Sequence, residues 1–170
     1  MKKLFPLFLL VLFIACDPPD EPNLKEYEAQ INKNLDSWNE AASNADFKTY
    51  FDFLTEDAVF IGTDAKENWV KKDFAVWAKP YFDKKKTWHF KALERHIHFD
   101  TTGNLAWFDE LLSTQMKICR GSGVLVRNPN NQWKLKQYVL SITMPNDSIA
   151  GAVRIKSPIE DSLIRKLEKK

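Results

Sequence analysis

The spacing of apolar side chains divides this chain into a helical first half and a second half made of strands. From Leu24 onward, apolar residues recur every three or four positions, which predicts an amphipathic helix whose buried stripe contains Tyr27, Ile31, Leu35, Trp38 and Ala42. A second short helix is expected after Asp46, and a short strand over 58–61. Asp64 and Glu67 have the spacing of a capping box, which predicts a further helix that ends or kinks at Pro80.

After residue 87 the apolar period changes to two, which is typical of strands. We expect four long strands, over 88–99, 105–116, 118–127 and 133–143. The apolar side of the first one changes from Trp88, Phe90 and Ala92 to Leu93, Ile97 and Phe99, and such a change of face requires a bulge or a sharp bend. A short C-terminal helix is expected to begin at Ser157, with Pro158 in its first turn.

Helices followed by one antiparallel meander predict the α+β fold class. The expected architecture is a cone-shaped barrel, in which the N-terminal helices pack on a strongly curved antiparallel sheet and roof over an interior space.

The N-terminal segment predicts the location of the protein. Lys2 and Lys3 precede a short apolar run that ends at Ala15, which is the layout of a secretory signal over 1–15. Because Cys16 follows directly, the segment resembles the lipobox of bacterial lipoproteins. That resemblance implies lipidation of Cys16 and anchoring to a bacterial membrane in the cell envelope, with residues 16–23 as a proline-rich tether. The alternative is an ordinary secretory signal with an incidental cysteine.

Charge and composition exclude several partners. The formal charge of +2 includes Lys2 and Lys3, so the chain without its signal has 2 − 2 = 0 and offers no basic excess to nucleic acid. We expect no cofactor, because phosphate-loop and dinucleotide motifs are absent from the sequence. We expect no metal, since His96 and His98 alone are too few to close a zinc site. Cys119 is expected to be a small buried hydrophobe.

Four segments carry a family resemblance: 60–64, 106–110, 119–125 and 133–145. Together they resemble the SnoaL-like branch of the nuclear transport factor 2-like superfamily over about residues 24–146, which leaves 147–170 as a C-terminal extension. The resemblance implies a cone with an interior pocket and a homodimer formed through the sheet. Some members are enzymes, such as ketosteroid isomerase and scytalone dehydratase. Related sequences often carry histidines on the last strand, where this chain has Gln137 and Val139.

Asp109 and Glu110 are the candidate catalytic residues if the protein is an enzyme. They are adjacent on a strand and therefore point to opposite faces, and periodicity alone does not choose between them. We favour Asp109 for the pocket, because strands of this family often place an aromatic residue just before the pocket acid. A carboxylate in an apolar cavity has a raised pKa and can act as a general base. The alternative is a structural salt bridge to Arg95 or Arg120.

The remaining candidates would line a ligand pocket. Arg120 could anchor a carboxylate-bearing ligand, and Ser122 shares its face. Gly121 and Gly123 leave a gap on the other face, which would accept Trp107, a ligand or the curvature of the sheet. The full set of expected pocket residues is Trp69, Tyr81, Phe82, Trp107, Arg120, Ser122 and Gln137.

Three functions are compatible with these observations. The favoured one is a non-catalytic envelope lipoprotein that binds a small apolar ligand or a protein partner in its cone. The second is an isomerase, cyclase or dehydratase that uses Asp109 or Glu110 as a general base. The third is a structural dimer with a filled cone.

Overall fold

The computed structural model describes residues 22–169. In chain order these form α1 (Leu24–Ser43), α2 (Phe47–Asp52), β1 (Leu54–Ile61), β2 (Asn68–Val70), α3 (Lys71–Asp83), β3 (Lys91–Phe99), β4 (Leu105–Thr114), β5 (Lys117–Arg127), β6 (Trp133–Ile142), the 3-10 helix η1 (Asn146–Ser148) and α4 (Ile149–Leu167). The expected signal segment, Cys16 and most of the tether lie outside the described residues. Within the described range, no helix is both long and apolar enough to span a bilayer.

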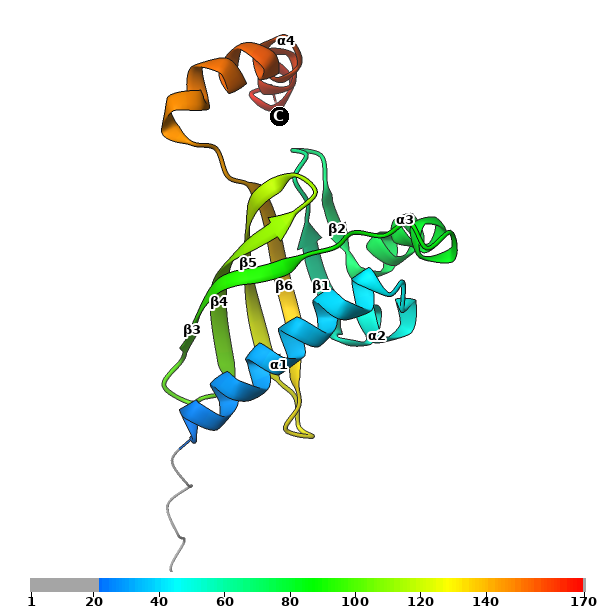
Figure 1. The fold of residues 1–170 in the computed structure, drawn as a ribbon, viewed down its shortest axis with the longest axis vertical. Coiled ribbons are helices and arrows are strands. Elements are labelled where there is room, and N and C mark those ends of the chain that lie inside the picture. Colours follow the sequence, from blue (N-terminus) through cyan, green and yellow to red (C-terminus); the bar gives the residue numbers. More distant parts are fainter. Residues whose placement is uncertain (1–21, 170) are drawn as a thin grey trace, which may run out of the picture.

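The six strands form one sheet in the order β2-β1-β6-β5-β4-β3. Helices α1, α2 and α3 cover one face of this curved sheet, so the α+β cone is confirmed (Figure 1). The sheet is mixed rather than wholly antiparallel, because β1 pairs with β6 in parallel. We call the face under the helices the inner face and the opposite one the outer face.

Helix α1 follows the predicted pattern. Asn23 is its N-cap and accepts a hydrogen bond from the Glu26 amide at 3.3 Å. Ile31, Leu35, Trp38 and Ala42 are buried against the sheet, as the apolar spacing predicts. The Trp38 indole donates to the Tyr50 carbonyl at 3.2 Å, which joins α1 to α2.

The prediction for residues 64–80 is wrong in two respects. Glu67 accepts from the Asp64 amide at 3.1 Å, but this bond closes a turn and not a helix start. The chain then returns as β2, with Trp69 opposite Phe60 of β1. Helix α3 begins only at Lys71 and continues through Pro80 to Asp83. Its buried side consists of Phe74, Ala78 and Phe82, whereas Trp77 and Tyr81 are exposed.

The predicted change of face in the first long strand corresponds to an irregularity in β3. The register between β3 and β4 shifts between Ala92 and Glu94. Leu93 lies at this bulge and is 54% exposed, so its expected place on the apolar side is wrong. Residues 88–90 precede the strand, and Trp88 and Phe90 pack partly buried against the core.

The C-terminal helix is much longer than expected. It begins at Ile149 instead of Ser157, and Pro158 lies in its interior. Ser157 does not cap a helix start, because its hydroxyl donates back to the Val153 carbonyl at 2.8 Å, one turn earlier.

The inner face of the cone is filled by aromatic side chains. Trp38 stacks on Tyr50 and meets Tyr138 edge-on, each with ring centroids 4.9 Å apart. Phe60 and Phe74 stack at 4.0 Å. These contacts occupy the space between the helices and the sheet where an open cone would hold a ligand.

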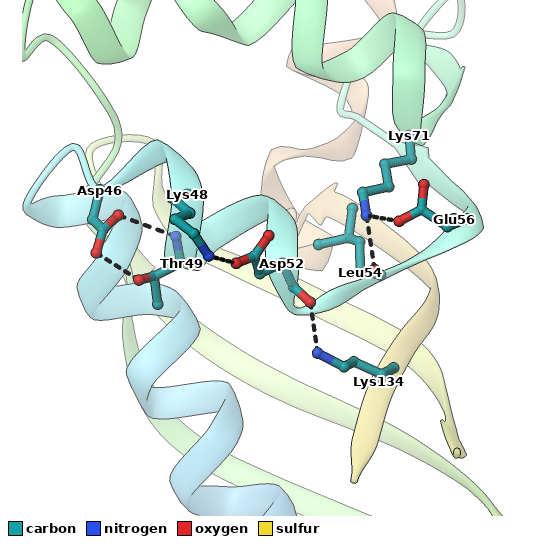
Figure 2. A network of polar contacts seen from close by, with 8 residues as sticks. All are labelled: Asp46, Lys48, Thr49, Asp52, Leu54, Glu56, Lys71 and Lys134. Atoms are coloured by element: carbon teal, nitrogen blue, oxygen red, sulfur yellow. Dashed lines mark hydrogen bonds and ion pairs between the residues drawn. The ribbon is translucent and has the colours of Figure 1, made fainter. Parts of the chain in front are cut away.

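A polar network holds the junction between α2 and β1 (Figure 2). The Lys134 ammonium donates to the Asp52 carbonyl at 2.7 Å, and Lys71 donates to the Leu54 carbonyl at 3.1 Å. The Lys134 ammonium thereby satisfies a carbonyl at the C-terminus of α2 that has no partner within the helix, whereas Lys71 binds the first carbonyl of β1. At the other end of α2, Asp46 caps the Thr49 amide at 3.0 Å. The network thereby fixes where the helical layer passes into the sheet.

Candidate functional site

Glu110 is a buried carboxylate on the inner face, in β4 next to the edge strand β3. It is 1% exposed, and Arg95 lies directly opposite it on β3. The Arg95 Nε donates to Glu110 Oε2 at 2.9 Å, and Arg95 Nη2 lies 2.8 Å from the same oxygen as an ion pair. The alternative to a catalytic role is a structural salt bridge to Arg95 or Arg120, and this charge-assisted pair is the salt bridge to Arg95.

Arg95 also ties this pair to α1. Its Nη1 donates to Asn32 Oδ1 and its Nη2 to Asp36 Oδ1, each at 3.0 Å. The Arg95 side chain is only 6% exposed, so the guanidinium is buried among three partners from two layers of the fold. One charged group therefore connects the edge strand β3, its neighbour β4 and the helix α1 above them.

Tyr138 and Gly121 complete the surroundings of Glu110. Tyr138 donates its hydroxyl to Glu110 Oε1 at 3.3 Å, and burial raises the pKa of that hydroxyl, which keeps it a neutral donor. A Cβ atom at Gly121 would lie 2.3 Å from the Tyr138 hydroxyl and 2.9 Å from Glu110 Oε1. The gap expected at Gly121 is therefore filled by these two side chains, and neither Trp107 nor a ligand occupies it.

The burial of Glu110 raises its pKa above the ordinary value of 4.5, and the Arg95 guanidinium opposes that shift. A general base must reach the proton of a bound substrate. Two hollows border α1, one of about 580 Å³ beside β6 and one of about 600 Å³ beside β3, and Arg95 lines the second. Glu110 itself lines neither of them, nor the outer-face hollow, nor the aromatic cavity described below. Its geometry therefore serves to hold the fold together.

The preference for Asp109 as the residue facing the interior is corrected by the structure. Asp109 lies on the outer face, with its side chain 43% exposed and 3.5 Å from His96 Nδ1. The pleat of β4 is the physical reason, because Phe108, Glu110 and Leu112 share the buried face. His96 and His98 are both exposed on β3. No cluster of three or more potential metal ligands forms among the described residues.

Several predicted pocket residues come together on the outer face. Trp107, Ser122 and Gln137 line one hollow of about 410 Å³, together with His98 and Asp109. Arg120 is exposed on β5 and does not line that hollow. These residues lie outside the cone, so their expected role in an interior pocket does not fit this geometry.

A small cavity opens at one end of the cone, and we call it the aromatic mouth. Its volume is about 140 Å³. Its walls come from β1, the β1–β2 turn, β2, α3, the segment before β3, the β4–β5 turn and β6: Phe60, Gly62, Thr63, Glu67, Trp69, Phe74, Trp77, Trp88, Phe90, Gln115, Met116 and Leu140. Of the predicted pocket residues, only Trp69 lines it.

The rings of the aromatic mouth are nearly parallel. Trp69 and Trp77 stack at 4.9 Å with 25° between their planes, and Trp77 faces Trp88 at 6.3 Å and 27°. Trp77 is 39% exposed and presents its indole to solvent. Glu67 is the one ionisable residue among those lining the cavity. The arrangement offers flat apolar surfaces to a ligand and a single carboxylate at the rim.

The other predicted pocket residues on α3 have different roles. Phe82 is a core residue, 3% exposed, and Tyr81 is exposed and packs on Trp77 at 5.0 Å. Cys119 is fully buried, as expected.

The sequence pattern did not identify four residues of the cavity: Trp77, Trp88, Phe90 and Met116. Trp77 lies between exposed Val76 and buried Ala78, so it is at the boundary between the core and the solvent.

The first prediction concerns the buried ion pair. Replacing Arg95 with methionine should destabilise the fold by about 3–5 kcal/mol at neutral pH, because Glu110 would remain as a buried charge without its cation. The pKa of Glu110 in the folded state would rise further above 4.5. A raised acid pKa costs stability as pH rises from the unfolded-state value. The deficit measured by urea unfolding should therefore shrink as the pH falls towards about 4.5, and the part due to the Glu110 charge should be absent below that value.

Its control is Arg95→Met combined with Glu110→Gln, which removes the uncompensated charge and keeps an acceptor for Tyr138. This double variant should recover most of the lost stability at neutral pH. A deficit that is independent of pH, and equal in the single and double variants, would contradict the assignment.

Solved structures with the same fold share little sequence with this chain. An NTF2-like protein of unknown function from Pseudomonas putida matches with a TM-score of 0.61 and 14% identity, over 73% of this chain and 92% of that one. A candidate dehydratase of the NTF2-like family from Streptomyces avermitilis matches with a TM-score of 0.61 and 14% identity, over 72% and 100%. A candidate ketosteroid isomerase from Parabacteroides distasonis matches with a TM-score of 0.53 and 19% identity, over 68% and 86%.

Because only 14–19% of the residues are identical, the similarity to these structures shows a shared fold and not a shared activity. No curated protein matches this chain. The family model for the SnoaL-like domain matches residues 31–145, which is most of the described range. That span runs from the first buried residue of α1 to the end of the segment after β6. The chain therefore belongs to the SnoaL-like domain family.

Proposed function

We propose that this SnoaL-like domain binds a small, mostly apolar molecule at the aromatic mouth and does not catalyse a reaction. The observation that carries the proposal is the composition of the mouth, where parallel indole rings meet solvent and the only ionisable lining residue is Glu67. Ligand sites are typically apolar concavities with a few polar groups that fix orientation. The mouth has that character.

The chemistry of the mouth favours a flat, uncharged ligand. Aromatic rings prefer offset stacking, and each such contact adds to the free energy of area burial. A carboxylate-bearing ligand has no anchor there, because Arg120 is on another strand face and Glu67 would repel it. The cavity of about 140 Å³ is smaller than the 300 Å³ or so of typical ligand sites, so part of a bound molecule would project from it.

An enzyme of the isomerase or dehydratase type is the alternative, and two of the similar structures carry such names. The raised pKa of Glu110 is the one feature that favours it. Against it, both oxygens of Glu110 already have partners in Arg95 and Tyr138. A substrate would have to compete with these two partners for that carboxylate.

Binding at the mouth can be tested with the neutral fluorescent probe N-phenyl-1-naphthylamine. Replacing Trp77 with alanine should weaken its affinity about five-fold, because one exposed stacking surface is lost. Trp107→Ala is the matched control, since Trp107 is 44% exposed on the outer face and Trp77 39% exposed at the mouth. The control should change the dissociation constant less than two-fold or so. Equal losses in both variants would contradict the proposal.

We further propose that the protein is a lipoprotein of the cell envelope, anchored through Cys16. The support is the sequence of the N-terminal segment alone. Replacing Cys16 with serine in a bacterial host should abolish incorporation of radiolabelled palmitate and release the protein from the membrane fraction, because the thiol that carries the lipid is absent. Cys119→Ser serves as the control and should leave both unchanged. Labelling that persists in Cys16→Ser would refute the anchor.

We also propose a homodimer through the outer face of the sheet. Leu105 and Trp107 are exposed there, at 37% and 44%, beside the hollow lined by Val124 and Val139. Exposed apolar patches of this kind mark interaction sites. Replacing Trp107 with glutamate should weaken dimerisation at least about ten-fold in sedimentation equilibrium, because a charge would be buried in the interface. A wild-type chain that stays monomeric at high concentration would exclude the dimer.

A further inference from the structure

The C-terminal helix α4 carries an apolar side that nothing in the described chain covers. Ile155, Ile159, Leu163 and Leu167 follow one another at intervals of four residues, so they lie on one side of the helix. Ile155 is 77% exposed and Ile159 71% exposed, and no residue of α4 is buried. Such a side is stable in water only when it is packed against another apolar surface.

The aromatic mouth lies at the same end of the molecule as α4. The β4–β5 turn and the β1–β2 turn both form its rim, through Met116 and through Thr63 and Glu67. Strand β6 runs parallel to β1 and so ends on this side as well. Figure 1 shows α4 beyond this end of the sheet, above the two turns.

An apolar path connects the mouth to α4. Leu140 of β6 lines the mouth, and Ile142 is the next residue of the same strand face. Ile142 is 49% exposed, and Met144 in the following segment is 46% exposed. Trp77 and Tyr81 of α3 add two further exposed rings at the mouth. The aromatic mouth and the apolar side of α4 are therefore two uncovered apolar surfaces, and only residues 143–148 separate α4 from the strand that leads to the mouth.

We propose that α4 folds back onto the aromatic mouth of its own chain and covers it as a lid. Residues 143–148, which contain Pro145 and the turn η1, form the hinge. The Ile155–Leu167 side of α4 faces Trp77 and Tyr81 in the closed arrangement. The docking of α4 needs no ligand, but its role as a lid rests on the proposed function, because the closed helix supplies the wall that the small cavity lacks.

The structure favours the aromatic mouth of the same chain as the docking surface for α4, over a second copy of the chain or a membrane. A connection of six residues keeps α4 at an effective concentration on the order of millimolar near this surface, which a second copy reaches only at high protein concentration. A membrane surface is disfavoured because α4 lies at the end of the molecule opposite the start of α1, to which the expected lipid anchor is attached (Figure 1).

Disulfide trapping in the full-length chain tests the lid. Ile159→Cys is paired with Trp77→Cys, or with Tyr81→Cys in case loss of the indole disturbs α3. The matched control is Asp161→Cys with the same partners, since residue 161 is two positions along and on the far side of α4. Under mild oxidation without any probe, the Ile159 pairs should form an intramolecular disulfide at least ten times faster than the Asp161 pairs.

Three results would overturn the lid. Equal rates for the Ile159 and Asp161 pairs would show that α4 moves freely. Disulfide-linked dimers would show that α4 covers the aromatic mouth of a second copy of the chain. Sedimentation of the Cys16→Ser chain with phosphatidylglycerol vesicles, lost on Ile159→Asp, would show that α4 binds membrane. Because no probe is present, failure of the lid leaves the binding of N-phenyl-1-naphthylamine at the mouth as a separate result.

Discussion

The pair between Arg95 and Glu110 is the constraint on which the rest of this structure depends. It joins β3 to β4 across the sheet, and through Asn32 and Asp36 it fixes α1 over the inner face. Removing water from two charges is costly, so the pair must keep all its partners to be tolerated. Gly121 lacks a side chain because the Tyr138 hydroxyl and Glu110 need that space. The side chains around Glu110 inside the cone therefore serve to hold the helices on the sheet.

This structural role of the Arg95–Glu110 pair determines where a ligand can bind. Arg95 balances the charge of Glu110, and Trp38, Tyr50 and Tyr138 pack on one another between the helices and the sheet. The interior around Glu110 therefore offers a ligand neither free space nor a free base. The hollow lined by aromatic rings lies at the end of the cone, where Trp69, Trp77 and Trp88 form the aromatic mouth. The same fold that supports catalysis elsewhere is used here, in our proposal, as a support for a binding surface. Fold alone does not assign the activity, and the side chains at each site must do so.

Periodicity predicted α1, the four long strands and the irregularity in β3, because each depends on which residues alternate along a single segment. It did not choose between Asp109 and Glu110, since the buried face of β4 is set by the pairing of Glu110 with Arg95. The hydrogen bonds of Asp64 and Glu67 occur equally in a helix start and in a turn, and the pairing of Trp69 with Phe60 decided for the turn. Local spacing does not determine which distant segments pair, and the aromatic mouth is built from segments that lie far apart in the sequence, from β1 to β6.

The most direct measurement is an NMR titration of the chain labelled with ¹³C at methionine methyl groups and glutamate carboxyl carbons. Met116 lines the mouth and Glu110 lies in the closed interior. With N-phenyl-1-naphthylamine the account predicts a saturable shift of the Met116 methyl resonance while the Glu110 carboxyl resonance stays in place. A titration in which Glu110 responds and Met116 does not would show that the ligand enters the interior, and would contradict the account.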